Sequence, residues 1–224
     1  MEFAIILLIS YLGISAAYYL LFSVGSLYSH PNEGQSSLIR QNKIAVLIPA
    51  YKEDGVIVDS AIRALEQVYA PSLYTIYVIA DSLQKKTLQL LKELPIEVVE
   101  VSFEKSTKAK ALNVTMKQLD ASYQIAVVLD ADNVMEVNFL QKVNEAYNAG
   151  FLAIQGHRIA KNQENNLSVL DAISEEVNNN IFRKGHRALG FSSALIGSGM
   201  AFDLKLFQKE MSEIDAIGGF DKEM

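Results

Sequence analysis

The sequence begins with a long stretch that carries no charge: residues 3–28 contain no Asp, Glu, Lys or Arg. A helix of about 20 apolar residues is long enough to cross the hydrocarbon core of a bilayer. A secretory signal peptide fits less well, because the start, Met1 and Glu2, is not basic and the apolar run exceeds the length of a signal's hydrophobic region. We therefore expect a transmembrane helix over residues 1–28, with a buried helix of a soluble protein as the alternative.

A polar segment, residues 29–42, follows this run and is typical of a juxtamembrane linker. The first basic residues after the run are Arg40 and Lys43, whereas Glu2 lies before it. Because Lys and Arg are enriched on the cytoplasmic side of membrane proteins, we expect membrane attachment with the main domain, residues 43–224, in the cytoplasm.

From residue 43 onward, short apolar runs alternate with amphipathic segments. The runs predict strands at 43–49, 73–80, 96–101, 123–129 and 151–155. The segments predict helices at 56–68, 83–94, 106–119, 137–149, 167–189 and 204–211, and three Asn residues at 178–180 indicate a break in the long one. This alternation predicts an α/β domain whose mostly parallel sheet has helices on both faces.

Two carboxylates, Asp130 and Asp132, directly follow the apolar run 126–129. A buried strand of this kind would deliver them to the edge of the sheet where open α/β sheets bind ligands. Two acids one residue apart repel each other, and a hard divalent cation, Mg²⁺ or Mn²⁺, relieves the repulsion and bridges to substrate phosphates. The alternative is an Asp/Asn-rich turn after a strand.

Two other expected strands end at acidic loops, Tyr51–Asp54 and Asp81. Parallel topology would bring these ends beside Asp130. Taken singly, Asp54 and Asp81 could instead cap the helices that follow them. Tyr51 could stack on a nucleobase or pack on the sheet.

Three lysines, Lys105, Lys108 and Lys110, supply the opposite charge at the start of an expected helix. Basic side chains suit a phosphate there, because the backbone N–H groups and the helix dipole already favour an anion. A solvated lysine run is the alternative, above all for Lys105.

The bulk composition excludes several classes of protein. The net charge of −6 over 224 residues argues against a nucleic-acid partner, which needs an excess of Lys and Arg. The chain has no Cys, so disulfide scaffolds, thiol catalysis and cysteine-based zinc sites are excluded.

Seven short motifs occur in the order found in family 2 glycosyltransferases. They are Ile-Pro-Ala-Tyr-Lys-Glu (48–53), Val-Ile-Ala-Asp-Ser (78–82), Lys-Ala-Lys-Ala-Leu-Asn (108–113), Leu-Asp-Ala-Asp-Asn (129–133), Gln-Gly-His-Arg (155–158), Gly-Ser-Gly-Met-Ala-Phe (197–202) and Gly-Gly-Phe-Asp (218–221). From about residue 43 to its end, the chain resembles the membrane-attached branch of that family, related to cellulose and hyaluronan synthases.

This resemblance implies a GT-A fold, a nucleotide-sugar donor such as a UDP-sugar, and inverting transfer to a glycan or lipid-linked acceptor. It implies a nucleoside site at Ala50, Tyr51 and Glu53, a base contact at Asp81, a diphosphate site at Lys108 and Lys110, a donor and metal contact at Asp130, a metal ligand at Asp132, and an acceptor side at Gly197, Ser198 and Gly199. In such enzymes a carboxylate deprotonates the acceptor hydroxyl while lysine and metal stabilise the leaving diphosphate.

The sequence departs from the family at its C-terminal end. The family's catalytic base lies a few residues beyond Gly-Gly-Phe, where this chain has only residues 221–224. Glu223 is a weak candidate, and we expect the base beyond Met224 and the chain to be incomplete there. The acceptor-binding Gln-x-x-Arg-Trp motif is absent as well, since the chain has no Trp.

Three other functions compete with this reading. A phosphohydrolase of the haloacid dehalogenase type would use Asp130 as nucleophile, but its D-x-D motif usually follows the first strand and this one follows about the fourth. A dinucleotide-binding oxidoreductase lacks its G-x-G-x-x-G motif after an early strand. A membrane-anchored protein that binds sugar nucleotides without transferring the sugar fits the missing base.

Overall fold

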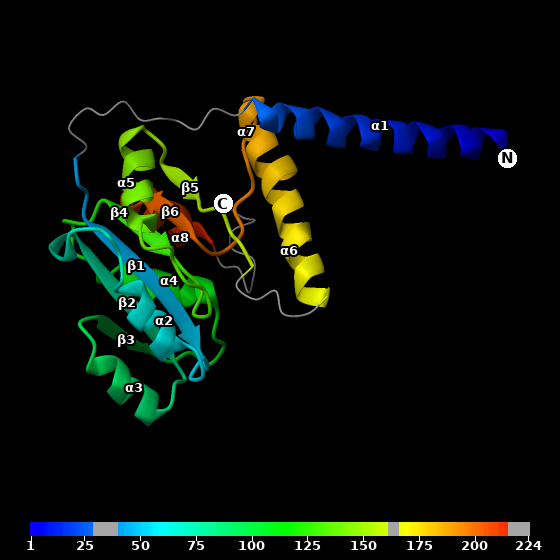
Figure 1. Cartoon of the computed structure of the whole chain (residues 1–224). Helices are drawn as coiled ribbons and strands as arrows, with labels where there is room; N and C mark the ends of the chain where they lie inside the picture. Colours follow the sequence, from blue (N-terminus) through cyan, green and yellow to red (C-terminus); the bar gives the residue numbers. More distant parts are fainter. Residues whose placement is uncertain (29–39, 161–165, 215–224) are drawn as a thin grey trace. The chain divides into compact units, whose positions relative to one another are not determined.

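The computed structural model describes residues 1–28, 40–160 and 166–214. Its contacts divide the chain into two compact units. The helical unit comprises residues 1–33 and 157–194, and the sheet unit comprises residues 34–156 and 195–224. Figure 1 shows the elements of each unit.

The sheet unit is built on six strands in the order β3-β2-β1-β4-β6-β5. These are β1 Ile44–Tyr51, β2 Tyr74–Asp81, β3 Glu97–Val101, β4 Ile125–Val128, β5 Ala153–Gln155 and β6 Met200–Asp203. The first four are parallel, and β6 runs antiparallel to both β4 and β5. The predicted, mostly parallel α/β sheet is confirmed. Strand β6 was not predicted, because its apolar run is only three residues long and follows a glycine-rich turn.

Helices cover both faces of this sheet. One face packs against α2 Ile57–Ala64, α3 Lys85–Lys92 and α5 Phe139–Asn148, and the other against α4 Lys108–Met116 and α8 Leu204–Glu213. A short 3₁₀ helix, Pro71–Leu73, leads into β2. Successive residues of a strand point to opposite faces, so Val46 lies in the first core and Leu47 in the second. Burial on both faces explains why the strands are continuous apolar runs.

The sheet changes direction at β1. The chain adds β2 and β3 on one side of β1, then crosses to place β4 on the other side. Tyr51 and Asp81 are register partners at the ends of β1 and β2, and the Leu129 N–H donates to the Leu47 carbonyl at 3.0 Å beyond β4. The ends of β1 and β4 therefore flank a topological switch point, the usual ligand position of an open α/β sheet.

The start of the sheet unit is fastened to α5. The Asn42 N–H donates to Asn144 Oδ1 at 3.0 Å, and the Arg40 carbonyl accepts from Asn148 Nδ2 at 2.8 Å. Residues 29–39, which hold most of the predicted linker, lie outside the described residues.

The helical unit contains α1 Glu2–Leu27, α6 Asn166–Asn178, a π-helix over Asn179–Gly185 and α7 His186–Ala188. By length and composition, α1 is long and apolar enough to cross a membrane. The break expected at residues 178–180 is a widened turn, and the helix continues through it. Asn179 explains this change, because its side chain donates to the Arg158 carbonyl at 2.8 Å and accepts from Arg183.

Candidate functional site

A lysine and an aspartate meet at the edge of the sheet unit. Helix α4 begins at Lys108, and Thr107 caps it by accepting from the Lys110 N–H at 3.2 Å. The Lys108 ammonium pairs with Asp130 Oδ1 and donates to the Gly197 carbonyl at 2.5 Å. The Lys108 side chain is 27% exposed and that of Asp130 38% exposed, so a solute can reach the pair.

The glycine-rich turn 197–199 braces the loop that carries Asp130. Ser198 is fully buried, and its Oγ accepts from the Asp130 N–H at 2.9 Å and from Asn133 Nδ2 at 2.6 Å. Gly197 and Gly199 have φ angles of 78° and 63°, a conformation that glycine adopts without strain. Ser198, of the predicted acceptor side, is thereby hydrogen-bonded to the backbone of Asp130, a predicted donor-binding residue.

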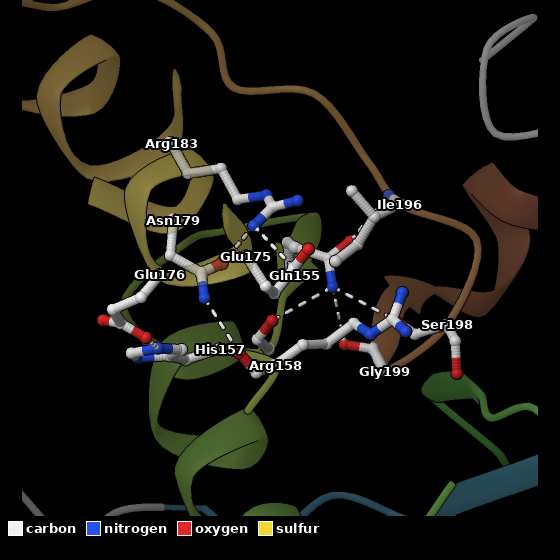
Figure 2. Close-up of polar contacts among 11 residues, drawn as sticks. Gln155, His157, Arg158, Glu175, Glu176, Asn179, Arg183, Ile196, Ser198 and Gly199 are labelled. Carbon is white, nitrogen blue, oxygen red and sulfur yellow. Dashed lines mark hydrogen bonds and ion pairs between the residues drawn. The ribbon is translucent and has the colours of Figure 1, made fainter. Parts of the chain in front are cut away.

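Gln155, at the end of β5, holds this turn in place (Figure 2). Its Oε1 accepts from the Ile196 N–H at 3.0 Å, and its Nε2 donates to the Ser198 carbonyl at 3.0 Å and the Gly199 carbonyl at 3.3 Å. Gln155 belongs to a recognised motif but received no predicted role. An amide side chain at the end of a short apolar strand was the sequence feature that could have indicated this role of Gln155.

The ends of β1 and β2 form the second part of the edge. The Lys52 N–H donates to the Asp81 carbonyl at 3.1 Å, and the Asp81 carboxylate, which is buried, accepts from Ser82 Oγ at 2.9 Å. Lys52 and Ser82 both have positive φ angles, 57° and 58°. Such backbone outliers concentrate at functional sites. Tyr51 is half exposed, and the Lys52 ammonium lies 5.0 Å from its ring centroid.

The structure describes the remaining predicted site residues except Glu223. Ala50 is buried at the end of β1, and Glu53 is exposed in the following loop. The Lys110 ammonium donates to the Lys105 carbonyl at 3.3 Å, and Asp132 is exposed two residues beyond Asp130. Glu223 lies outside the described residues.

Asp54 caps a different helix from the one predicted. Its Oδ1 accepts from the Gln84 N–H at 2.9 Å, at the start of α3 rather than α2. Hydrogen bonds from the Thr87 hydroxyl and then the Gln84 N–H lower the pKa of the Asp54 carboxyl. Asp81 does not cap α3, whose N-cap residue is Gln84.

The carboxylates suit one mode of metal binding. Among residues 1–28, 40–160 and 166–214, no three Asp, Glu or His side chains gather into an all-protein metal cage. Mg²⁺ and similar ions are commonly held by one or two carboxylates together with substrate phosphates. The half-exposed Asp130 and the exposed Asp132 fit that mode.

Solved structures share this fold. The mannosyltransferase PcManGT from Pyrobaculum calidifontis, in complex with GDP-Man and Mn²⁺, matches with a TM-score of 0.67 and 18% identity over 92% of this chain and 56% of that chain. S. aureus TarS 1–349 matches with a TM-score of 0.55 and 14% identity, over 75% of this chain and 48% of that chain. This chain therefore spans about half the length of these two proteins.

A third match is 4-diphosphocytidyl-2C-methyl-D-erythritolsynthase from Anaerococcus prevotii DSM 20548, with a TM-score of 0.50 and 13% identity over 83% of this chain and 82% of that chain. No curated protein matches the sequence.

The predicted GT-A fold is confirmed by these likenesses together with the match of a protein-family model. That model is described as glycosyltransferase like family 2 and covers residues 41–224, which is most of the chain. The chain is therefore a member of glycosyltransferase family 2.

Proposed function

We propose that this chain transfers a sugar from a nucleotide-diphosphate sugar to a hydroxyl group of a glycan or lipid-linked acceptor, with inversion and with a divalent metal. The observation that carries the proposal is the meeting of Lys108, Asp130 and the turn 197–199 beside the β1–β4 switch point. That meeting sets a cation, a carboxylate and a helix start at the edge where α/β sheets bind nucleotides. The GDP-Man in PcManGT supports a nucleotide-sugar donor.

The donor would lie along the ends of β1, β2 and β4. Tyr51 offers an exposed ring for the nucleobase, and stacking on an aromatic ring is worth about 1–3 kcal/mol. Asp81, held by Ser82, would accept from the base, and Ala50 and Glu53 would border the nucleoside. Lys108 would turn from Asp130 towards the diphosphate, with Lys110 beside it on the same helix.

The transfer step needs a base on the acceptor side and a stabilised leaving group. The base removes the acceptor's hydroxyl proton, the oxygen bonds to the anomeric carbon, and the bond to the diphosphate breaks on the opposite face. The nucleoside diphosphate leaves with additional negative charge, which Lys108 would stabilise. A divalent ion held by Asp130 and Asp132 would neutralise further charge on the diphosphate. The turn 197–199 would border the acceptor.

Membrane attachment through α1 is part of the proposal. Residues 1–28 would span the bilayer, residues 29–42 would link, and the domain 43–224 would lie in the cytoplasm, as Arg40 and Lys43 suggest. The test is extraction of membranes at alkaline pH: the chain is expected to stay in the pellet. Release into the supernatant would refute the anchor.

Binding of nucleotides tests the donor site. The full chain in detergent would be titrated calorimetrically with UDP and GDP, with and without Mn²⁺. We expect one of them to bind in a Mn²⁺-dependent manner. Asp132→Asn should remove that dependence, because the nearly isosteric amide lacks the negative charge that Mn²⁺ requires. Asp59→Asn, which alters an exposed aspartate paired with Arg63, is the matched control.

An assay of sugar transfer distinguishes a transferase from a protein that binds sugar nucleotides without transferring the sugar. Release of the nucleoside diphosphate from the sugar nucleotide that binds, in the presence of membranes that supply the acceptor, would support the transferase. Metal-dependent binding without any release would support the binding protein. Unchanged Mn²⁺ dependence in Asp132→Asn would refute the metal assignment.

A further inference from the structure

Helix α6 of the helical unit has an exposed apolar face. Successive residues of an α-helix turn by about 100°, so positions three and four apart share a side. The exposed apolar side chains that share this side are Leu167, Leu170, Ile173 and Val177, with exposures of 70%, 62%, 55% and 46%. Ser168, Ala172 and Glu175, which are less exposed, lie on the other side. Helix α6 is therefore amphipathic, and its apolar side is the open one.

The polar side of α6 is bound within the helical unit (Figure 2). Glu175 pairs with Arg183 at 3.1 Å, and both side chains are largely buried. Glu176 Oε2 lies 3.0 Å from His157 Nε2, and the hydrogen bond between them lowers the pKa of the Glu176 carboxyl. These contacts fix which side of α6 faces its own unit, and they leave the apolar side turned outward.

The end of this helical segment is joined closely to α1. A Cβ on Gly185 would lie 2.2 Å from the Phe22 carbonyl oxygen, so only glycine permits this approach. The Tyr18 hydroxyl bonds to His186 Nε2 at 2.7 Å, and the Phe22 ring lies 4.2 Å from that of His186. From this joint α6 runs crosswise to α1, not along it (Figure 1). If α1 crosses a membrane, a crosswise α6 lies along the membrane plane.

Exposed basic residues lie at the same joint. Lys184 and Arg187 are exposed, one on each side of Gly185, next to the C-terminal end of α1. Arginine and lysine at the end of a membrane-spanning helix are attracted to anionic lipid headgroups.

We propose that α6 lies on the surface of an anionic bilayer, with its apolar side in the boundary between headgroups and acyl chains. Lys184 and Arg187 would then lie among the headgroups where α1 leaves the bilayer. An amphipathic helix with an open apolar side and nearby cations has the composition of such interfacial helices. The inference rests on the proposed anchor α1, and it assigns a second membrane contact far along the sequence.

Tryptophan fluorescence tests this contact directly, because the chain has no Trp of its own. Single-Trp variants Leu170→Trp, on the apolar side, and Ser168→Trp, on the other side, would be reconstituted as full chains in vesicles of phosphatidylcholine and phosphatidylglycerol. Brominated phosphatidylcholine would serve as the quencher. We expect Leu170→Trp to lose most of its emission to the brominated lipid and Ser168→Trp to keep most of it. Leu170→Trp should also be quenched less without phosphatidylglycerol.

A third variant, Leu12→Trp in α1, separates the two proposals. Quenching at residue 12 without quenching at residue 170 would overturn the inference and leave the anchor standing. Absence of quenching at residue 12 would overturn the anchor and the inference with it. A blue-shifted but unquenched Leu170→Trp would show that protein, such as a second copy, covers this side, and would also overturn the inference. Equal quenching at residues 170 and 168 would contradict the proposed orientation.

Discussion

The two units of this chain use apolar residues in opposite ways. In the sheet unit, strands and helices bury their apolar side chains against one another, and Phe202 and Phe207 stack at 4.5 Å with almost no exposure. In the described residues of the helical unit, Phe22 is the one apolar side chain that is buried. The sheet unit therefore holds most of its apolar side chains in a closed core, whereas the helical unit displays most of its own on the surface.

The polar residues show the same contrast. At the site of the sheet unit, Lys108, Gln155 and Ser198 tie loops from distant parts of the chain to one edge. In the helical unit, polar contacts such as Arg183 with Glu175 shape one continuous helical segment and its joint. Under the proposed function, the sheet unit would bind the donor and carry out the transfer, and the helical unit would attach the chain to the membrane.

The largest difference between the two units is expected in the loss of stability when a large apolar side chain is shortened. Phe207→Ala is expected to destabilise the sheet unit by about 3–5 kcal/mol, because it leaves a cavity in a closed core. Leu170→Ala, at an exposed position of α6, should change stability in detergent by less than about 0.5 kcal/mol. Thermal unfolding of both variants in detergent measures the difference. Similar losses would contradict the description of α6 as an open surface.

The contact between α1 and the segment around Gly185 should be lost when Gly185 is substituted. Gly185→Ala puts a methyl group into the Phe22 backbone and is expected to separate α7 from α1. Gly13→Ala is the matched control, because a Cβ there meets nothing within 4 Å. Limited trypsin digestion after Lys184 and Arg187 should be markedly faster in Gly185→Ala alone. Equal digestion rates in both variants would show that the joint does not depend on this close approach.

The turn 197–199 should depend on the buried hydroxyl of Ser198. Ser198→Ala leaves the Asp130 N–H and Asn133 Nδ2 without that acceptor, at a cost of about 1–3 kcal/mol. Faster hydrogen exchange of the Asp130 amide would report the loss locally. Ser212→Ala, whose exposed hydroxyl donates to a carbonyl of its own helix, should leave that rate unchanged. An unchanged rate in Ser198→Ala would refute the bracing role.

The smallest effect is expected at Asp54 and should depend on pH. Because the fold lowers the pKa of Asp54, its contribution to stability is present above the unfolded value and is lost as the pH falls through the folded pKa. Asp54→Asn should therefore reduce the fall in melting temperature between about pH 6 and about pH 3. Parallel curves for the mutant and the natural chain would contradict the capping of α3 by Asp54.

The sequence predicted what depends on local pattern. The strand before Asp130 is a continuous apolar run, and α4 carries Leu112 and Met116 at helical spacing, so both were placed from nearby residues. The hydrogen bonds of Gln155 were not predicted, because their partners lie 41 to 44 residues away along the chain. Strand β6 was not predicted either, because it pairs with β4 and β5, which lie still further away along the chain. The bond between Asp54 and Gln84 spans 30 residues and was assigned to the wrong helix for the same reason. Pairings between distant segments are fixed by the packed sheet, and no local pattern encodes them.

The position of the diphosphate is the central claim, and the affinity of Lys108→Gln tests it most directly. UDP and GDP would be titrated in the presence of Mn²⁺ into Lys108→Gln and into Lys142→Gln, whose lysine pairs with Glu136 on the surface. A hydrogen bond to a charged group is worth about 1.5–3 kcal/mol, so Lys108→Gln should weaken binding about 10- to 100-fold. Lys142→Gln should bind like the natural chain. Equal affinity in both variants would contradict a diphosphate site at the start of α4.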